Sequence, residues 1–394
     1  MTTVYLKKNK EESLRRFHPW VFSGAVARAD GRLQDGDIVR VCSAEGEVLG
    51  VGHWQESSIA VRMLSFDASG TLPTDFFEER IHTAYIMRHA MGLDRPDNNC
   101  YRLVHGEGDF LPGLVIDIYD NIAVLQAHSA GMHVARQQIA QAICSTLKHI
   151  KGVYYKSEGT LPLKRTFTDI QDGWLVKAEK QEYVATENGL RFYIDWLRGQ
   201  KTGFFLDQRN NRSLVEKYAE GRRVLNMFCY TGGFSVYAMR GGASIVHSVD
   251  SSAKATDLAC RNMELNFSGC ERHQAFTDDA FRFLDNTTNG CYDLIILDPP
   301  AFAKHRDAVK NAIQGYRRLN EKAFEKIAAG GILFTFSCSQ AIDKQMFRLA
   351  VFTAAANTGR KVRILHQLHQ PEDHPVSIYH PEGEYLKGLV LYVE

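Results

Sequence analysis

A chain of 394 residues is longer than one hydrophobic core usually organises, so two or three domains are expected. Its 44% hydrophobic and 24% charged residues are typical of a globular protein and argue against extended disorder. The 47 basic and 46 acidic residues nearly cancel, which excludes a wholly basic surface, so any nucleic acid would be bound by local patches.

The sequence shows neither a secretion signal nor a membrane span, because the N-terminus lacks an apolar core and no later apolar run approaches about 20 residues. We therefore expect a cytoplasmic protein that does not enter a membrane. The 8 cysteines are scattered, without a CxxC pair or a Cys/His group at zinc spacing. This pattern predicts neither a disulfide framework nor a structural metal ion.

The first region, residues 1–71, is predicted to be a small β-rich domain. Short alternating or β-branched runs lie between Val4 and about Phe66, separated by turns rich in Gly and Asp. Basic residues outnumber acidic ones in residues 1–20. From charge alone, this segment is either an RNA contact or a solvated surface.

The second region, residues 72–184, is predicted to be an α+β domain. The apolar spacing over residues 74–92 suits an amphipathic helix. Residues 101–128 are expected to form two strands around a Pro-Gly turn, followed by a helix over 132–149 and a strand within 151–159. Strands and helices are thus expected to mix within this region.

The third region, residues 185–394, is predicted to be a doubly wound, Rossmann-like α/β domain. It opens with a hairpin whose turn is Glu187-Asn188-Gly189. Four apolar runs follow, each succeeded by a helical pattern, as expected for a parallel sheet covered on both faces. These runs are RRVLNMFC, SIVHSVD, YDLIILD and GILFTFS.

The first of these strands ends in a small-residue turn that opens a helix, within Val224 to Ala238. Gly232 and Gly233 let the backbone approach a ligand, and the helix N-terminus offers N–H groups to a carboxylate. The spacing differs from GxGxxG, which disfavours a nicotinamide dinucleotide.

Three acidic residues stand at the ends of successive predicted strands. Asp250 lies 18 residues after Gly232 (250 − 232), where a carboxylate can accept both hydroxyls of a ribose. Asp279 is placed for an adenine edge, but a helix N-cap is an equally open reading. Asp298 ends the fourth strand. The series predicts a cofactor that contains adenosine.

Asp298 and Cys338 are the residues expected to act in the reaction. The segment Asp298-Pro299-Pro300 sets a carboxylate and a rigid backbone beside the methyl group of such a cofactor, S-adenosylmethionine. Cys338 follows a buried strand, and Ser339 is expected to cap the next helix, whose N-terminus would lower the pKa of the thiol. A thiolate there can add to carbon 6 of a cytosine and make carbon 5 nucleophilic. The alternative is a small buried cysteine without a chemical role.

The chain resembles, over nearly its whole length, the bacterial large-subunit (23S) ribosomal RNA cytosine-5 methyltransferases that carry an N-terminal PUA domain. RFHPWVFSGAV is similar to the start of that RNA-binding domain, and GEGDFLPGLVIDIYD to the central domain. TGFFLDQRNNR, NMFCYTGGFSVYA, VDSS, DPPAF and FSCS resemble the catalytic-domain motifs, in the same order. The resemblance implies that Cys338 is the nucleophile. It also implies cofactor contacts from Phe228, Tyr230, Thr231, Gly232, Asp250, Asp279 and Asp298, with Gln208 or Arg209 close by.

Two other functions stay open at this point. Many cytosine-5 RNA methyltransferases have a second cysteine after the DPP-type proline, where this chain has Ala301 and Phe302, so the group that completes the reaction is not assigned. Guanine N-methyltransferases share the DPP and TGFFLDQR patterns, and the cysteine in FSCS is what favours cytosine. A non-catalytic RNA-binding assembly factor is the third reading.

The expected partner is ribosomal RNA, bound as a single strand or a splayed loop, because the target base must leave any stack before it can react. Residues 18–22 are either an RNA contact or a packed aromatic edge. The oligomeric state is left open by the sequence, a homodimer included.

Overall fold

The computed structural model describes residues 1–161, 167–178, 183–303 and 306–394, and the chain divides into two compact units. Among these residues, no helix combines the length and the apolar character needed to cross a membrane. All 8 cysteines are free thiols. The division into three domains stays a prediction, since the chain separates into two units. Unit 1 comprises Met1–Ala185, Ile194–Leu206 and Glu372–Gly383, and unit 2 comprises Thr186–Tyr193, Asp207–Pro371 and Glu384–Glu394.

A six-stranded sheet of unit 1 occupies the β-rich region predicted near the N-terminus, in the order β2-β6-β5-β4-β1-β3. Strands β1 and β4 are parallel, and the other neighbours are antiparallel. Alternate residues such as Val39, Val41 and Val61 are fully buried and form its core. The elements are β1 (Thr2–Leu6), α1 (Glu12–Arg15), β2 (Trp20–Phe22), β3 (Val26–Ala29), β4 (Ile38–Cys42), β5 (Val48–Trp54) and β6 (Ile59–Ser65).

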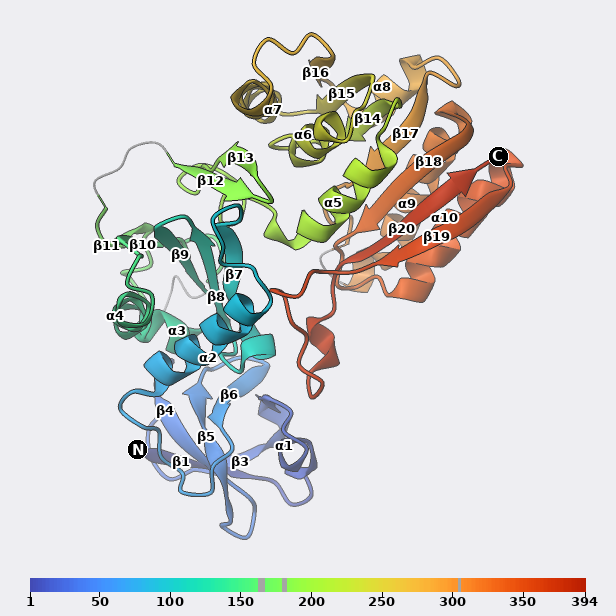
Figure 1. Ribbon diagram of the computed structural model, residues 1–394. Coiled ribbons are helices and arrows are strands. Elements are labelled where there is room, and N and C mark those ends of the chain that lie inside the picture. The colour runs from blue at the N-terminus through green and yellow to red at the C-terminus, as the bar shows by residue number, and fades with distance from the viewer. Residues whose placement is uncertain (162–166, 179–182, 304–305) are drawn as a thin grey trace. The chain divides into compact units, whose positions relative to one another are not determined.

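The second sheet of unit 1 has five strands in the order β11-β10-β9-β8-β7, with helices α2 and α4 in contact with each other (Figure 1). The predicted mixture of helices and strands is confirmed here. The elements are α2 (Phe76–Ala90), β7 (Cys100–His105), β8 (Leu114–Tyr119), β9 (Ile122–Ala127), α3 (Ala130–Val134), α4 (Arg136–Thr146), β10 (Gly152–Tyr155) and β11 (Gly173–Val176).

Two details predicted for this region are wrong. Residues 101–128 contain three strands instead of two, because Asp120 and Asn121 make a tight turn between β8 and β9, with Asp120 at a φ of 56°. Both residue types favour turns. The helix expected over 132–149 is interrupted at Ala135, which ends α3 and precedes α4.

A cluster of aromatic and histidine side chains surrounds Trp20 in unit 1. The indole Nε1 of Trp20 donates to Glu107 at 2.9 Å, and its ring centroid lies 4.3 Å from that of His380. His18 accepts the backbone N–H of Trp20 at Nδ1, which leaves Nε2 as the protonated nitrogen facing Glu382 at 3.6 Å. Trp20 is therefore a packed residue, whereas Phe22 is 50% exposed.

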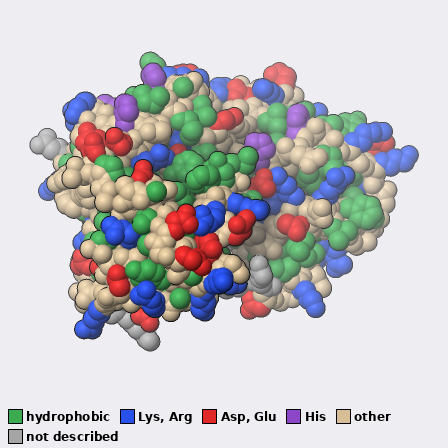
Figure 2. Space-filling model, turned by 90° about the horizontal axis from the view of Figure 1, so that it is seen from below, with side chains coloured by type: hydrophobic (Ala, Val, Ile, Leu, Met, Phe, Trp, Pro, Cys, Tyr) green, Lys and Arg blue, Asp and Glu red, His purple; other side chains and the backbone are tan. Residues whose placement is uncertain are grey.

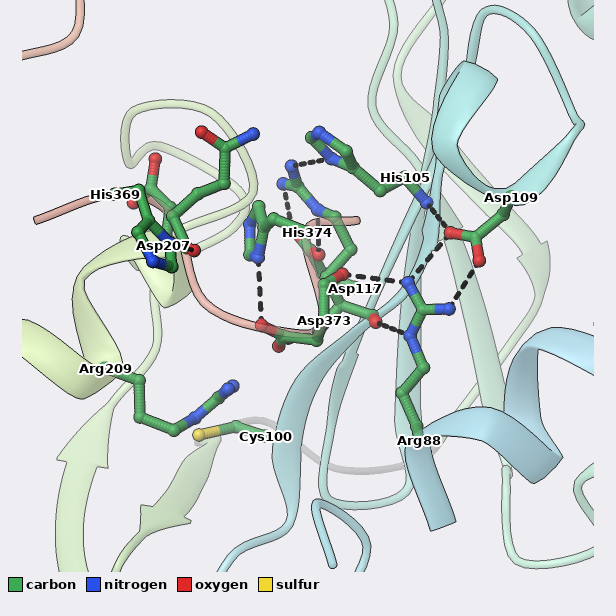
Figure 3. Close-up of polar contacts among 12 residues, drawn as sticks. Arg88, Cys100, His105, Asp109, Asp117, Asp207, Arg209, His369, Asp373 and His374 are labelled. Carbon is green, nitrogen blue, oxygen red and sulfur yellow. Dashed lines mark hydrogen bonds and ion pairs between the residues drawn. The ribbon is translucent and has the colours of Figure 1, made fainter. Parts of the chain in front are cut away.

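A buried network of charges ties the segment Glu372–Gly383 to the rest of unit 1 (Figure 3). Arg88 is fully buried and binds both carboxylate oxygens of Asp109, at 2.5 and 2.8 Å. Its Nη2 also donates to the carbonyl oxygen of Asp373 at 2.8 Å, and the carboxylate of Asp373 accepts the backbone N–H of Arg102. Since each charge has an ionic or hydrogen-bonding partner, the network is compatible with a buried core.

A seven-stranded sheet forms the centre of unit 2, in the order β16-β15-β14-β17-β18-β20-β19. The first five strands are parallel neighbours, which confirms the predicted α/β fold. Strand β20 is antiparallel to both β18 and β19 and was not predicted. The strands are β14 (Arg223–Met227), β15 (Ile245–Asp250), β16 (His273–Thr277), β17 (Tyr292–Leu297), β18 (Ile327–Ser337), β19 (Val362–Leu368) and β20 (Lys387–Val393).

Helices cover both faces of this sheet (Figure 1). One face packs against α8, α9 and α10 through side chains such as Leu225, Leu297 and Leu333. The predicted hairpin is present as β12 (Val184–Glu187) and β13 (Leu190–Tyr193), and its turn has positive φ at Asn188 and Gly189. The helices are α5 (Arg209–Tyr218), α6 (Gly233–Arg240), α7 (Ala253–Asn266), α8 (Ala280–Asn286), α9 (Val309–Lys326) and α10 (Lys344–Thr358).

Surface charge follows the near-neutral composition. The formal net charge is +1, and basic and acidic side chains are interspersed on the face drawn in Figure 2. In the N-terminal basic segment, Arg15 pairs with Glu47 and Arg16 pairs with Glu12. Lys7, Lys8 and Lys10 are exposed.

Candidate active site

The predicted site residues of unit 2 lie at the carboxyl ends of five adjacent parallel strands, except for Gln208 and Arg209, which lie at the start of α5. Strand β14 lies between β15 and β17. The chain proceeds outward from β14 to β15 and β16, then crosses to the other side for β17 and β18, so the strand order reverses between β14 and β17. Open α/β sheets bind their ligands at such a reversal.

The loop after β14 has a strained backbone. The φ angles of Phe228, Tyr230 and Gly232 are 58°, 45° and 74°. For the two aromatic residues this conformation costs about 1–3 kcal/mol each, and such strain is concentrated at functional sites. Asn262 holds the loop by donating to the carbonyl oxygen of Thr231 at 2.8 Å. The loop that contains Phe228, Tyr230, Thr231 and Gly232 leads directly into α6.

Asp250 closes β15 beside this loop. One carboxylate oxygen accepts the backbone N–H of Tyr230 at 3.0 Å, and the other accepts that of Ser252 at 3.0 Å. These bonds orient the half-buried carboxylate, and each oxygen retains a second lone pair for a ligand hydroxyl. The oriented carboxylate and the strained loop fit an adenosine-containing cofactor at this position.

Asp279 is the N-cap of α8. Its side chain accepts the backbone N–H of Arg282 at 3.0 Å, and the residue is exposed at the end of the loop that follows β16. The capping role left open by the sequence is therefore present. A contact of Asp279 with an adenine edge stays a prediction.

Asp298 follows β17 and is held by Gln208. The side-chain amide of Gln208 donates to Asp298 at 3.0 Å and accepts from Asn211 at 2.6 Å. The Nε of the neighbouring Arg209 lies 3.6 Å from the buried carboxylate of Glu187. Of the pair Gln208 and Arg209, the structure thus brings Gln208 to Asp298.

Cys338 lies immediately after β18 and is half-buried. Its Sγ is 4.0 Å from the carbonyl oxygen of Pro299, which follows Asp298. The two neighbours of Cys338 are anchored in the interior, since the hydroxyls of Ser337 and Ser339 each lie 3.0 Å from the Tyr316 hydroxyl. The thiol therefore stands at the strand end beside the Pro-Pro segment, outside the packed core.

The expectation that Ser339 caps the next helix is wrong. Ser339 is fully buried against Tyr316, and α10 begins at Lys344. The N-cap is Asp343, whose carboxylate accepts the backbone N–H of Met346 at 2.7 Å. Cys338 precedes this cap by five residues (343 − 338), so it is not itself part of the helix N-terminus that was expected to lower the pKa of the thiol.

Cys229 is a second cysteine near this edge and lies in the strained loop. Burial, followed by the negative charge of Asp250, raises the pKa of the Cys229 thiol. This residue is 6% exposed, and its thiol therefore stays protonated at neutral pH.

Two residues of this edge were missed by the sequence analysis. Asn262, on α7, orients the loop after β14, and Lys387, at the start of β20, contacts the loop that begins with Cys338. Both interactions join segments that are far apart in the chain. The run KGLVLYV gave no signal, because it is an ordinary apolar strand apart from its first residue.

Comparison with known proteins gives a family for both parts of the chain. Residues 102–383 match the S-adenosylmethionine-dependent methyltransferase family, and residues 4–66 match a PUA-like domain. A solved structure of a Streptococcus mutans protein, assigned to the SAM-dependent methyltransferases, is 23% identical, covers 100% of both chains and has a TM-score of 0.83. This structure supports the fold alone.

Curated relatives align over almost the entire chain. The ribosomal RNA large subunit methyltransferase I of Aeromonas hydrophila is 40% identical over 99% of this chain and 98% of its own length. The protein with the same name from Escherichia coli is 37% identical over 99% of both. The chain therefore belongs to the S-adenosylmethionine-dependent methyltransferases, in the family of the ribosomal RNA large subunit methyltransferases I.

Proposed function

We propose that this protein transfers a methyl group from S-adenosylmethionine to carbon 5 of a cytosine in large-subunit ribosomal RNA, through a covalent bond from Cys338 to the base. The observation that carries the proposal is the position of Cys338. Its thiol stands at the end of β18 beside Pro299, and the adjacent strand β17 delivers Asp298. A thiol and a carboxylate thus follow neighbouring parallel strands, at the end of the sheet where α/β proteins bind nucleotides.

The need for a thiolate follows from the chemistry of cytosine. Carbon 5 of cytosine is a poor nucleophile on its own. When the Cys338 thiolate adds to carbon 6, the electron density of the ring moves to carbon 5, which can then take up a methyl group. The cofactor supplies that methyl group on a positively charged sulfur. The Cys338–carbon 6 bond breaks again once a base has removed the carbon 5 proton.

Asp298 would hold the cytosine by its ring nitrogen and amino edge. Its carboxylate is oriented by Gln208, which is itself fixed by Asn211, so the acceptor is in place before the base arrives. One carboxyl oxygen would accept from the amino group of the cytosine, and a proton shared between the other oxygen and ring nitrogen 3 would stabilise the negative charge that develops on the ring as the thiolate adds. Asp250 and the loop Phe228–Gly232 would hold the adenosine and methionine parts of the cofactor.

Ribosomal RNA is proposed as the substrate because the relatives carry that substrate in their names. The PUA-like match adds a second region able to contact RNA. The target cytosine must be unpaired or splayed out of its stack, since its carbon 5 has to reach the strand ends. A cytoplasmic location is part of this proposal.

The decisive variant is Cys338→Ala. We expect it to abolish methyl transfer to ribosomal RNA while the variant still binds S-adenosylhomocysteine, measured as a thermal shift. Cys260→Ala is the matched control, because Cys260 is an exposed cysteine of the same unit and should leave activity unchanged. Full activity of Cys338→Ala would contradict covalent catalysis.

A nucleoside digest of the methylated RNA identifies the product. The proposal predicts 5-methylcytidine, whereas methylguanosine would show that the guanine N-methyltransferase reading is right. Binding of RNA without any cofactor-dependent thermal shift would instead support an assembly factor.

A further inference from the structure

Lys387 stands out as a buried cation next to the proposed nucleophile. It is 6% exposed and begins β20, where its backbone pairs with that of Ser337 on β18. Ser337 directly precedes Cys338 in the chain. Lysine is rarely found in such a position, because burying an ammonium group is costly unless partners stabilise it.

The amine of Lys387 binds two carbonyl groups of the loop between β18 and α10. Its Nζ donates to the carbonyl oxygen of Ser339 at 2.6 Å and to that of Ile342 at 2.7 Å. These carbonyls belong to the first and fourth residues after Cys338. The two bonds therefore fix the course of the loop that carries the thiol, much as Tyr316 fixes it from the side of α9.

Lys387 can be either neutral or protonated near physiological pH. Burial lowers the pKa of Lys387 to about 8, whereas the negative charges of Cys338, Asp343 and Glu384 act to raise it and the positive charge of Lys344 acts to lower it. A neutral amine has two N–H groups, enough for the two carbonyls, and one lone pair that can take a proton. An unperturbed thiol has a pKa of about 8.5, close to that of this amine.

Cys338 does not belong to the N-terminus of the helix that follows it. The N-cap of α10 is Asp343, five residues beyond Cys338 (343 − 338). Its carboxylate adds a negative charge, which does not favour a thiolate nearby. Lys387 is a cation whose contacts and electrostatic influence reach the Cys338 loop.

We propose that Lys387 is the positioning residue of Cys338. The amine of Lys387 holds the loop through its two carbonyl contacts and takes the proton of the Cys338 thiol. In that step the S–H bond breaks, its electron pair stays on Sγ, and a third N–H bond forms on Nζ. The positive charge of the resulting ammonium then stabilises the thiolate. The inference rests on the proposed function only in taking Cys338 as the nucleophile.

The test measures how readily Cys338 forms a thiolate, without RNA or methyl transfer. The full-length protein is alkylated with iodoacetamide from pH 6 to pH 10, and the labelling rate of the peptide containing Cys338 is followed by mass spectrometry. We expect Lys387→Met to raise the midpoint of the rate-versus-pH curve by about one pH unit or more, because the proton acceptor and the cation are both lost. Lys387→Arg keeps the positive charge but cannot accept a proton, so the charge alone should hold the midpoint at or below that of the unmodified protein.

The control is Lys361→Met, since Lys361 is an exposed lysine of the same unit and should leave the midpoint unchanged. Should Lys387→Met fail to fold, Lys387→Gln retains two N–H donors without a proton to exchange and provides the same comparison. A folded Met or Gln variant with an unshifted midpoint would overturn the proposal and leave Lys387 with a purely structural role.

The two proposals fail separately. Retained methylation by Cys338→Ala would remove the proposed chemistry while the alkylation result still stood. An unshifted midpoint together with an inactive Cys338→Ala variant would remove only the role of Lys387.

Discussion

Unit 1 and unit 2 both hold carboxylates away from bulk water, but they partner them differently. In unit 1, Asp109 and Asp117 are buried and bind the guanidinium groups of Arg88 and Arg102 with both oxygens. At the strand ends of unit 2, Asp250 is half-buried and accepts backbone N–H groups. The first arrangement neutralises a charge, whereas the second orients a charge and keeps it available to a ligand.

The same distinction separates residues within unit 2. Glu187 is fully buried and binds Arg212 through two bonds of 2.8 and 2.7 Å, so it belongs with the structural pairs of unit 1. Asp298, which lies at a strand end and accepts from the amide of Gln208, belongs with Asp250. The nature of the partner thus separates structural carboxylates from those proposed to bind ligands.

The largest expected effect is on the stability of unit 1. Arg88→Met would leave the carboxylate of Asp109 buried without its ionic partner, and breaking such a pair typically costs about 3–5 kcal/mol. All four tryptophans, Trp20, Trp54, Trp174 and Trp196, lie in unit 1, so urea unfolding followed by tryptophan fluorescence reports on this unit.

The matched control for this substitution is Arg95→Met, because Arg95 and Asp97 form a pair with side chains that are 46% and 58% exposed. Exposed pairs contribute about 0–1 kcal/mol. Equal losses of stability in the two variants would break the comparison between buried and exposed charge.

A second prediction concerns the strained loop of unit 2. Gly232→Ala places a Cβ 2.8 Å from the Cβ of Ala259 at a φ of 74°, so the turn must shift. We expect the affinity for S-adenosylhomocysteine, measured by calorimetric titration, to fall at least about tenfold, which corresponds to about 1.4 kcal/mol.

Gly359→Ala is the control that separates backbone strain from the steric contact with Ala259. Gly359 has a similar φ of 67°, but a Cβ there meets nothing within 4 Å. This control should lose a comparable amount of stability from backbone strain alone and retain its cofactor affinity. Loss of affinity for S-adenosylhomocysteine in both variants would show that the effect of Gly232→Ala does not arise from the loop itself.

The sequence predicted those parts of the fold that depend on local patterns. The apolar runs that became β14, β15, β17 and β18 are each followed by a helix, and the hairpin turn at Asn188 and Gly189 follows from the φ values these residues tolerate. The acids at strand ends could be found because parallel strands deliver their carboxyl ends to one edge.

Other features depend on contacts between distant segments and could not be predicted. The antiparallel direction of β20 is fixed by its pairing with β18 and β19, and nothing in KGLVLYV encodes that direction. The helix after Cys338 was expected at Ser339, but that hydroxyl bonds to Tyr316 of α9 and the chain needs four more residues to reach Asp343. Lys387 reaches the same loop only through the sheet.

A third prediction is a loss of stability of unit 1 in acid. Burial lowers the pKa of His53 to about 4, whereas the unfolded chain binds a proton near pH 6.5. Below about pH 6.5 the unfolded state therefore binds more protons than the folded state, and stability falls until about pH 4, by at most about 1.4 kcal/mol per pH unit. Tryptophan-detected urea unfolding between pH 7.5 and pH 4.5 measures the slope, and His53→Gln should make it shallower. An unchanged slope in that variant would assign the acid sensitivity to other groups.

The smallest effect is expected at Asp279, where a structural and a ligand-binding role share one carboxylate. Asp279→Ala removes the N-cap of α8 and should cost about 1 kcal/mol of stability. Asp279→Ser keeps a capping oxygen but is too short to reach beyond the helix end, so it should retain stability within about 0.5 kcal/mol. If the carboxylate also contacts the adenine edge, the Ser variant will bind S-adenosylhomocysteine several-fold more weakly in the same titration, because one hydrogen bond of about 1 kcal/mol is lost. An unchanged affinity would place Asp279 with the structural carboxylates of unit 1, despite its position at a strand end, and would limit the proposed ligand-binding acids to Asp250 and Asp298.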